Sequence, residues 1–561
     1  MKALLKEIYG KTDGELAFVK LQALIENTPI NEEKHQECFS QQDIVLITYG
    51  DSIKSRSGTA TPLQTLHQFC RTHLKDAIST IHILPFFPYS SDDGFSVKDF
   101  YSVDNALGTW NDILELKQDF KLMFDFVLNH ISAESDWFKA YLNCQEEFNE
   151  LAIEVAPNTD LSQVTRPRSL PLLTRFKKSD NTDVYVWTTF SEDQIDVNYT
   201  SVSILIKFIE ILLFYVSKGA KILRLDAIAY LWKQIGTNCI HLPHTHNIVK
   251  LFRKVLDQVA PEVMIITETN VPHNENISYF GNGHDEAQMV YNFTLPPLLL
   301  HSFIKEDITQ FSDWAETLGI QSATNTFFNF TASHDGIGVR PLEGILSERE
   351  LDRIISLVEE NGGRVSLKKN PNGSESAYEL NITYVDAYLK NTEESDEIHA
   401  KRFLASQAIQ LALPGVPAVY IHSLLGSHNW EEGVKQTNRA RTINRQKLFI
   451  EDVNHQLSDP DSFRSRVFLP YIDMIRCRVD QPAFHPNTSF EILKLHPQIF
   501  CIKRYCDSQE ITALTNISSQ SIKIYPHQLP GESVDLLTKK FFSGKEINLN
   551  PYQSIWLETK K

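Results

Sequence analysis

Short apolar runs recur along the chain, separated by segments in which the apolar positions follow a helical period. The runs are rich in isoleucine, valine and phenylalanine and are bounded by turn-forming residues, which is typical of strands buried on both faces. Eight strands alternating with helices predict an α/β fold, the (β/α)8 or TIM barrel. The alternative for the same pattern is an open, doubly wound sheet. The runs are residues 44–49, 80–85, 122–128, 221–225, 263–267, 289–292, 327–331 and 418–421.

The uneven spacing of these runs predicts two insertions. Long stretches follow the third and the seventh run, and structureless loops of that length are improbable in a compact domain. After about residue 487 short alternating strands indicate a small antiparallel β domain. The predicted domains are an N-terminal helical extension (1–42), a catalytic barrel (43–130, 197–335 and 402–487), inserted subdomains (131–196 and 336–401) and a C-terminal β domain (488–561).

Charge and cysteine content narrow the choice of partners and compartment. The net charge of −17 repels phosphate backbones and anionic lipid, so we expect neither nucleic acid nor a membrane as a partner. The seven scattered cysteines form no CxxC pair, and reduced thiols fit a cytoplasmic protein. Residues 1–10 lack the apolar core of a secretory signal. The most apolar stretch, residues 201–217, contains two charges and is interpreted as a buried barrel helix.

Polar side chains follow five of the predicted strands, where a barrel places its reacting groups. They are Ser91–Phe95 after the second run, Asn129-His130 after the third, Arg224–Ala227 at the fourth, Glu268 after the fifth and His334-Asp335 after the seventh.

Three carboxylates from different strands would meet at one point of a closed barrel: Asp226, Glu268 and Asp335. A retaining glycosidase needs two carboxyl groups about 5–5.5 Å apart, one as nucleophile and one as proton donor. A single such carboxylate is more often a helix N-cap, but three together favour catalysis. Arg224 precedes Asp226 by two residues, so both face the barrel interior, and its guanidinium should keep Asp226 ionised.

The histidines His130 and His334 are neutral donors suited to sugar hydroxyls. No HExxH or CxxC spacing supports a metal site, so we expect no metal.

Several segments resemble the α-amylase superfamily and, more narrowly, its sucrose-phosphorylase branch, from about residue 43 to the C-terminus. The superfamily segments are residues 47–51 (ITYGD), 84–88 (LPFFP), 92–95 (DDGF), 127–130 (VLNH), 223–227 (LRLDA), 267–268 (TE) and 333–338 (SHDGIG). The branch is indicated by residues 437–445 (TNRARTINR) and 190–196 (FSEDQID).

The resemblance implies a role for each matching residue. Asp226 would be the nucleophile, Glu268 the acid/base and Asp335 the transition-state stabiliser. The implied donor-site residues and their neighbours are Asp92, Phe95, His130, Phe190, Gln194, Arg224, His334 and Arg441, and Tyr230 would be an aromatic residue near the acceptor side. The implied reaction is double displacement with phosphate as acceptor, which gives α-D-glucose 1-phosphate without a cofactor. The implied partners are small-molecule substrates, and a homodimer is left open.

The acceptor side departs from sucrose phosphorylases, which lack the N-terminal 40 residues and the segments at 338–344 and 362–366. Tyr378 and Glu379 match an acceptor-site loop, but Glu379 stands where sucrose phosphorylases usually carry glutamine. This combination resembles the glucosylglycerate phosphorylases of the same branch, whose leaving group is D-glycerate. An anionic acceptor calls for arginine, so we expect Arg340 near the site and Glu379 paired with Arg340 or Arg364.

Other functions stay open at this point. Within enzymes they are phosphorylases for sucrose, sucrose 6'-phosphate or glucosylglycerol, and a plain hydrolase or transglucosylase. The alternative of another class is a catalytically silent barrel that serves as a binding subunit.

Overall fold

The eight predicted strands form a closed parallel barrel in the computed structural model, which describes residues 1–29, 38–168, 170–319, 322–370, 374–391, 393–525, 531–542 and 546–559. Around the barrel the strands follow one another in the order β1-β3-β4-β9-β10-β11-β12-β16. The barrel prediction is therefore confirmed, and the open sheet is excluded. The strands are β1 (Val45–Thr48), β3 (Thr80–Ile83), β4 (Lys121–Phe126), β9 (Ala220–Leu225), β10 (Met264–Thr267), β11 (Met289–Tyr291), β12 (Thr326–Phe330) and β16 (Val416–Tyr420).

Helices surround the barrel because its strands present apolar side chains outward as well as inward. The stretch at 201–217 forms α5 (Val202–Ser217), which buries eight of its side chains, as predicted for a barrel helix. In the part of the chain that the structure describes, no helix is long and apolar enough to cross a membrane. The other helices outside the two insertions and the N-terminal segment are α2 (Pro62–His73), α3 (Trp110–Asp119), α6 (Pro243–Val259), α7 (His273–Ile277), α8 (Leu295–Lys305), α9 (Thr309–Ala315), α12 (Asp396–Ala412), α13 (Ile421–Leu424), α14 (Glu431–Thr437), α15 (Ile450–Ser458) and α16 (Phe463–Val479).

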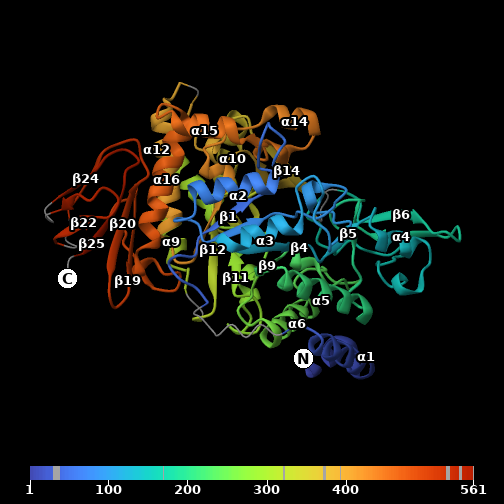
Figure 1. The fold of residues 1–561 in the computed structure, drawn as a ribbon. Helices are drawn as coiled ribbons and strands as arrows, with labels where there is room; N and C mark the ends of the chain where they lie inside the picture. The colour runs from blue at the N-terminus through green and yellow to red at the C-terminus, as the bar shows by residue number, and fades with distance from the viewer. Residues whose placement is uncertain are drawn as a thin grey trace.

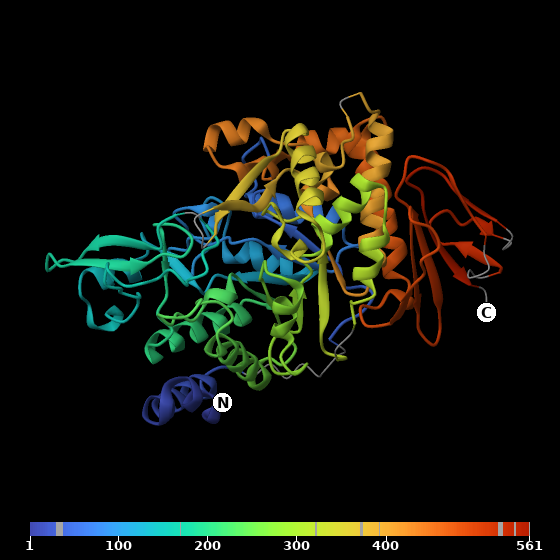
Figure 2. The ribbon, with the colours of Figure 1, turned by 180° about the vertical axis from the view of Figure 1, so that it is seen from behind.

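Two segments with structure of their own interrupt the barrel. Between β4 and β9 lie β5 (His130–Ser132), α4 (Asp136–Leu142), β6 (Leu173–Lys177), β7 (Asp183–Trp187) and β8 (Gln194–Asp196). Between β12 and α12 lie β13 (Ile337–Gly338), α10 (Glu348–Glu360), β14 (Arg364–Lys369), β15 (Glu375–Asn381) and α11 (Tyr384–Ala387). The first segment projects from the barrel on the side opposite the C-terminal sheet (Figures 1 and 2). The exact domain boundaries stay predictions.

The C-terminal strands form an antiparallel sheet of order β18-β19-β20-β25-β22-β23. These strands are β18 (Ser489–Ile492), β19 (Ile499–Tyr505), β20 (Glu510–Asn516), β22 (Ser533–Asp535), β23 (Phe541–Phe542) and β25 (Ser554–Thr559). A small apolar cluster of its own, which includes Cys501 and Leu514, covers one face. The predicted antiparallel C-terminal region is confirmed.

The N-terminal segment is helical, as expected, and forms α1 (Lys2–Glu26) with a break at Gly10, whose φ is 78°. It packs against α5 and α6 on the outside of the barrel (Figure 1). The Tyr9 hydroxyl donates a hydrogen bond to the Tyr199 carbonyl at 2.8 Å. Because the Tyr199 hydroxyl in turn donates to the carbonyl of Leu128, Tyr199 links α1 indirectly to the segment that leads into His130.

Candidate active site

The three predicted carboxylates line one pocket at the carboxyl ends of the barrel strands. Asp226 directly follows β9, Glu268 directly follows β10, and Asp335 lies in the loop after β12. Parallel strands in a closed barrel end on the same face, so residues far apart in sequence converge there. The convergence expected from the sequence is therefore present.

Arg224 lies beneath two of these carboxylates and fixes their arrangement. Its Nη1 lies 2.7 Å from Asp226 Oδ1, and its Nη2 lies 4.0 Å from Glu268 Oε2. Nη1 also donates to the buried carboxylate of Asp125, which His82 holds from the other side at 2.8 Å. Neighbouring strands thus present Asp226 and Glu268 around one guanidinium.

Burial raises the pKa values of the carboxyl groups of Asp226 and Glu268. For Glu268, burial and the charges of Asp226 and Asp335 raise the pKa to about 7, although Arg224 opposes the shift. The backbone N–H of Ala227 also donates to Glu268 Oε2 at 3.1 Å. A carboxyl group with such a pKa can donate a proton near neutral pH.

The sequence predicts that the Arg224 guanidinium favours the ionised form of Asp226, and the guanidinium does lower the pKa of Asp226, but burial opposes this effect. Burial raises the pKa of Asp226 above its usual value, and the Arg224 guanidinium lowers it only in part. The charge of Asp125 adds to the increase. The sequence places Arg224 correctly, but it does not reveal how completely the pocket is removed from water.

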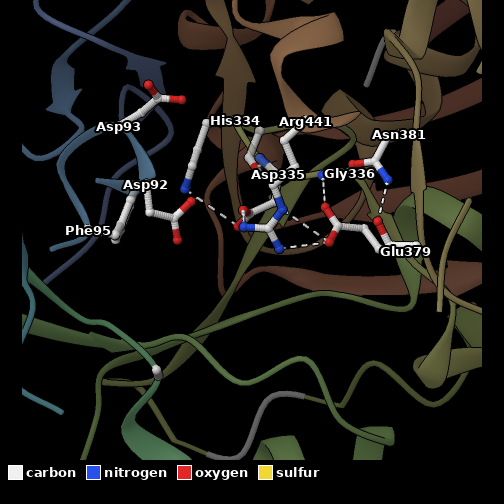
Figure 3. A network of polar contacts seen from close by, with 12 residues as sticks. Asp92, Asp93, Phe95, His334, Asp335, Gly336, Glu379, Asn381 and Arg441 are labelled. Carbon is white, nitrogen blue, oxygen red and sulfur yellow. Dashed lines mark hydrogen bonds and ion pairs between the residues drawn. The ribbon is translucent and has the colours of Figure 1, made fainter. Parts of the chain in front are cut away.

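Asp335 belongs to a chain of charges that also contains Arg441 and Glu379 (Figure 3). Arg441 Nη1 lies 2.7 Å from Asp335 Oδ1, and Arg441 Nη2 lies 2.7 Å from Glu379 Oε2. Glu379 also accepts a hydrogen bond from the Gly336 backbone N–H. Burial acts to raise the pKa of Asp335, but Arg441, His334 and Arg445 hold it well below its usual range.

The predicted pairing of Glu379 with Arg340 or Arg364 is wrong. Glu379 pairs with Arg441, which already borders the donor pocket. Arg340 Nε lies 3.7 Å from Oε1 of Glu343, which is three residues later in the same short helical turn. Arg364 Nη2 lies 3.0 Å from Glu431 Oε2. Arg340 lies outside the set of residues that line the pocket.

One wall of the pocket consists of aromatic rings and hydrogen-bonding side chains. The ring of Phe95 stacks on His334, with centroids 4.8 Å apart, and Phe190 lies against His130 and Tyr230. Burial lowers the pKa of His334 to about 3, so this imidazole is neutral, as expected.

Hydrogen bonds to one backbone carbonyl hold that wall in place. His130 Nε2 donates to the Phe95 carbonyl at 2.8 Å, and Gln194 Nε2 donates to the same oxygen at 3.0 Å.

Asp92 also lines the pocket, and its backbone has a φ of 53°, in the left-handed region. Burial acts to raise the pKa of Asp92, but Arg168, Arg441 and Arg445 hold it well below its usual range.

Comparison with known proteins places this site in a family. A model described as the catalytic domain of α-amylase matches residues 73–341. A glucosylglycerate phosphorylase from Spirochaeta thermophila is 48% identical over 92% of this chain and 89% of its own length. A glucosylglycerate phosphorylase from Escherichia coli is 44% identical over 99% of each chain. The chain belongs to the α-amylase superfamily.

Within the superfamily the chain lies in the sucrose-phosphorylase branch, as its motifs indicate. A sucrose phosphorylase from Agrobacterium vitis is 30% identical over 81% of this chain and 90% of its own length. The crystal structure of sucrose 6F-phosphate phosphorylase from Thermoanaerobacter thermosaccharolyticum has the same fold, with a TM-score of 0.75. It is 24% identical, and the match covers 91% of this chain and 98% of that chain.

The pocket of this α-amylase-superfamily chain also contains residues that the sequence did not single out. Arg168, Thr269 and Asn270 line it. Arg168 lies in the first insertion, and its Nη2 lies 3.4 Å from Asp92 Oδ2. Asn270 follows Glu268 by two residues, and its buried Oδ1 has no hydrogen-bond partner among the described residues.

Metal ligation has no support from the side chains of the described ranges. No group of three or more His, Cys, Asp or Glu residues there is placed to hold an ion. The charges that surround the carboxylates are instead guanidinium groups, those of Arg224, Arg441 and Arg445.

Proposed function

We propose that this chain is a retaining α-glucosyl phosphorylase that converts α-glucosyl-D-glycerate and inorganic phosphate into D-glycerate and α-D-glucose 1-phosphate. The observation that carries the proposal is the placement of Asp226 and Glu268 around Arg224, together with a Glu268 pKa of about 7. We infer D-glycerate as the acceptor because two glucosylglycerate phosphorylases are 48% and 44% identical to this chain, whereas the sucrose phosphorylase is 30% identical.

In the first step Asp226 attacks C1 of the glucosyl unit, and the bond from C1 to the glycerate oxygen breaks. Glu268 donates its proton to that departing oxygen, so the oxygen leaves as a neutral hydroxyl group and the carboxylate of glycerate is unchanged. A β-glucosyl ester of Asp226 results. Arg224, held by Asp125, orients the attacking carboxylate.

In the second step a phosphate oxygen attacks C1 from the side that glycerate has left, and the ester bond to Asp226 breaks. Glu268, now ionised, accepts a proton from the incoming phosphate. Two inversions at C1 give overall retention, so the product is the α-phosphate. Asp335, fixed by Arg441, binds the sugar hydroxyls and favours the flattened ring of the transition state.

The acceptor end of the pocket needs groups that accommodate an anion. Arg168 lines the pocket, and with only a 3.4 Å contact to Asp92 its guanidinium is available for carboxylate or phosphate oxygens. Tyr378 and Asn270 line the same pocket and supply polar atoms for the hydroxyl groups of glycerate. Glu379 is neutralised by Arg441 and therefore does not repel the substrate.

The cysteines support a proposal about the cell compartment. All seven are free thiols, and Cys144 is exposed. Exposed free thiols persist in a reducing environment, so we propose that the protein acts in the cytoplasm. A homodimer stays a prediction.

The test is phosphorolysis of glucosylglycerate and sucrose side by side, with glucose 1-phosphate as the readout. We expect phosphate-dependent glucose 1-phosphate from glucosylglycerate, at a kcat/KM at least about 100-fold above that with sucrose, since a site built for a carboxylate loses about 3 kcal/mol without it. Glucose release that does not depend on phosphate would contradict a phosphorylase. Equal use of sucrose would contradict the acceptor.

A further inference from the structure

A second hollow of about 350 Å³ lies beside the active-site pocket. The two share a wall, because Asp92, Arg168, Gln194, Tyr378 and Arg441 line both. A ligand in the hollow would therefore be separated from the glucosyl site only by side chains that border that site. The hollow has no part in the chemistry described above.

Four segments far apart in sequence surround this hollow, and the first is the loop after β3, which contributes Ser91 and Asp92. The first insertion contributes Pro167, Arg168 and Leu170, and the hairpin β14–β15 contributes Ser366, Leu367, Tyr378 and Glu379. In Figure 2 this hairpin reaches toward the first insertion. The fourth segment is 439–445, which contributes Arg439, Ala440, Arg441, Thr442 and Arg445.

Positive charge dominates the lining. Four arginines face two carboxylates, those of Asp92 and Glu379. Arg441 forms ion pairs with Asp335 and Glu379, and Arg445 Nη1 lies 2.5 Å from Asp93 Oδ2.

Arg439 differs from these two arginines because no residue that the structure describes holds its side chain in an ion pair. It is exposed, and no carboxylate within the described ranges forms an ion pair with it. An uncommitted guanidinium in a concave site attracts small oxyanions, although the chain as a whole has a net charge of −17.

We propose that this hollow is an anion-binding vestibule that captures inorganic phosphate before the phosphate reaches the glucosyl-enzyme, with Arg439 as its outer binding residue. The inference rests on the proposed phosphorylase function and adds a second phosphate site outside the reacting centre. Phosphate held between Arg439 and Arg168 lies next to the shared wall and reaches the pocket past Asp92 and Tyr378. Arg439 is a positioning residue, because it does not touch the reacting atoms.

The partition of the glucosyl-enzyme between two acceptors measures phosphate capture alone. Water and phosphate compete for the same intermediate, giving glucose and glucose 1-phosphate respectively. Since water is neutral, a charge change at Arg439 affects only the phosphate branch. The ratio of the two products at limiting phosphate is therefore independent of how well the donor binds.

The variants are Arg439→Glu and Arg439→Gln, with Arg71→Glu as the matched control. Arg71 is an exposed arginine in the last turn of α2, near the start of β3 and thus at the opposite end of the barrel. Arg71→Glu changes the net charge by the same amount as Arg439→Glu. Thermal unfolding of each variant verifies that the fold is intact.

At low ionic strength we expect Arg439→Glu to lower the ratio of glucose 1-phosphate to glucose by at least about fivefold, with a smaller decrease for Arg439→Gln. In about 1 M salt the difference should shrink below about twofold, because screening acts within about 3 Å. Arg71→Glu should leave the ratio unchanged. An unchanged ratio in Arg439→Glu at low salt would overturn the vestibule, whereas a wild-type protein that forms no glucose 1-phosphate would overturn the proposed function.

Discussion

Raising the pH from 6 to 8 should slow the first half-reaction by about tenfold, because Glu268 loses the proton that the leaving oxygen needs. Burial, Asp226 and Asp335 raise the pKa of Glu268 to about 7. With that pKa, about nine-tenths of the carboxyl groups are protonated at pH 6 and about one-tenth at pH 8. The raised pKa thus places the alkaline decline of activity inside the neutral range.

The quantity to measure is kcat/KM for glucosylglycerate at saturating phosphate. In a double displacement this constant reports the free enzyme and the donor step, so the ionisation of phosphate does not enter. On the acid side kcat/KM should also fall, because protonation of Asp226 removes the nucleophile, and burial shifts that limb upward from the usual range of an aspartate.

A donor that needs little proton donation provides the control. With α-D-glucosyl fluoride the decline between pH 6 and 8 should shrink to less than about twofold, since fluoride departs without a full proton transfer. The variant Glu268→Gln should lose about 100- to 10,000-fold with glucosylglycerate and much less with the fluoride. A flat profile with glucosylglycerate, or an equally steep decline with the fluoride, would refute the assignment of Glu268.

Two further substitutions test the contacts behind the pocket. Lys233→Met leaves Asp196 buried without the ammonium that lies 2.5 Å from it, and should lower the free energy of unfolding by about 3–5 kcal/mol. Denaturant titrations measure this free energy, and Lys401→Met, which removes the exposed ion pair with Glu397, is the control. The control should unfold with a free energy within about 0.5 kcal/mol of the wild-type value. Equal losses in the two variants would argue against a structural role for Lys233. Glu379→Gln removes a charge-assisted contact of about 1.5–3 kcal/mol from Arg441 and should lower kcat/KM by about 10- to 100-fold; unchanged kinetics would show that the chain of charges does not position Asp335.

The barrel and the carboxylate trio could be predicted from sequence because both follow from local patterns. Each strand is a short apolar run, and the polar residue that ends it necessarily lies on the catalytic face. Asp226 and Glu268 are adjacent to their strands, so little depends on the course of the loops.

The acceptor side could be predicted less well, because two insertions and a distant loop build it. The partner of Glu379 is Arg441, and this pair forms only when β15 packs beside the segment at 439–445. The nearer arginines Arg340 and Arg364 are engaged by Glu343 and Glu431. Arg168 reaches the pocket from the first insertion, whose course no periodicity in the sequence indicates.

Mass spectrometry of the quenched reaction of the Glu268→Gln variant with α-D-glucosyl fluoride tests the central claim most directly. The account predicts a peptide that carries the mass of one glucosyl unit as an ester on Asp226, and its disappearance when phosphate is added before quenching. A glucosyl ester on another residue, or steady turnover by an Asp226→Asn protein, would contradict it.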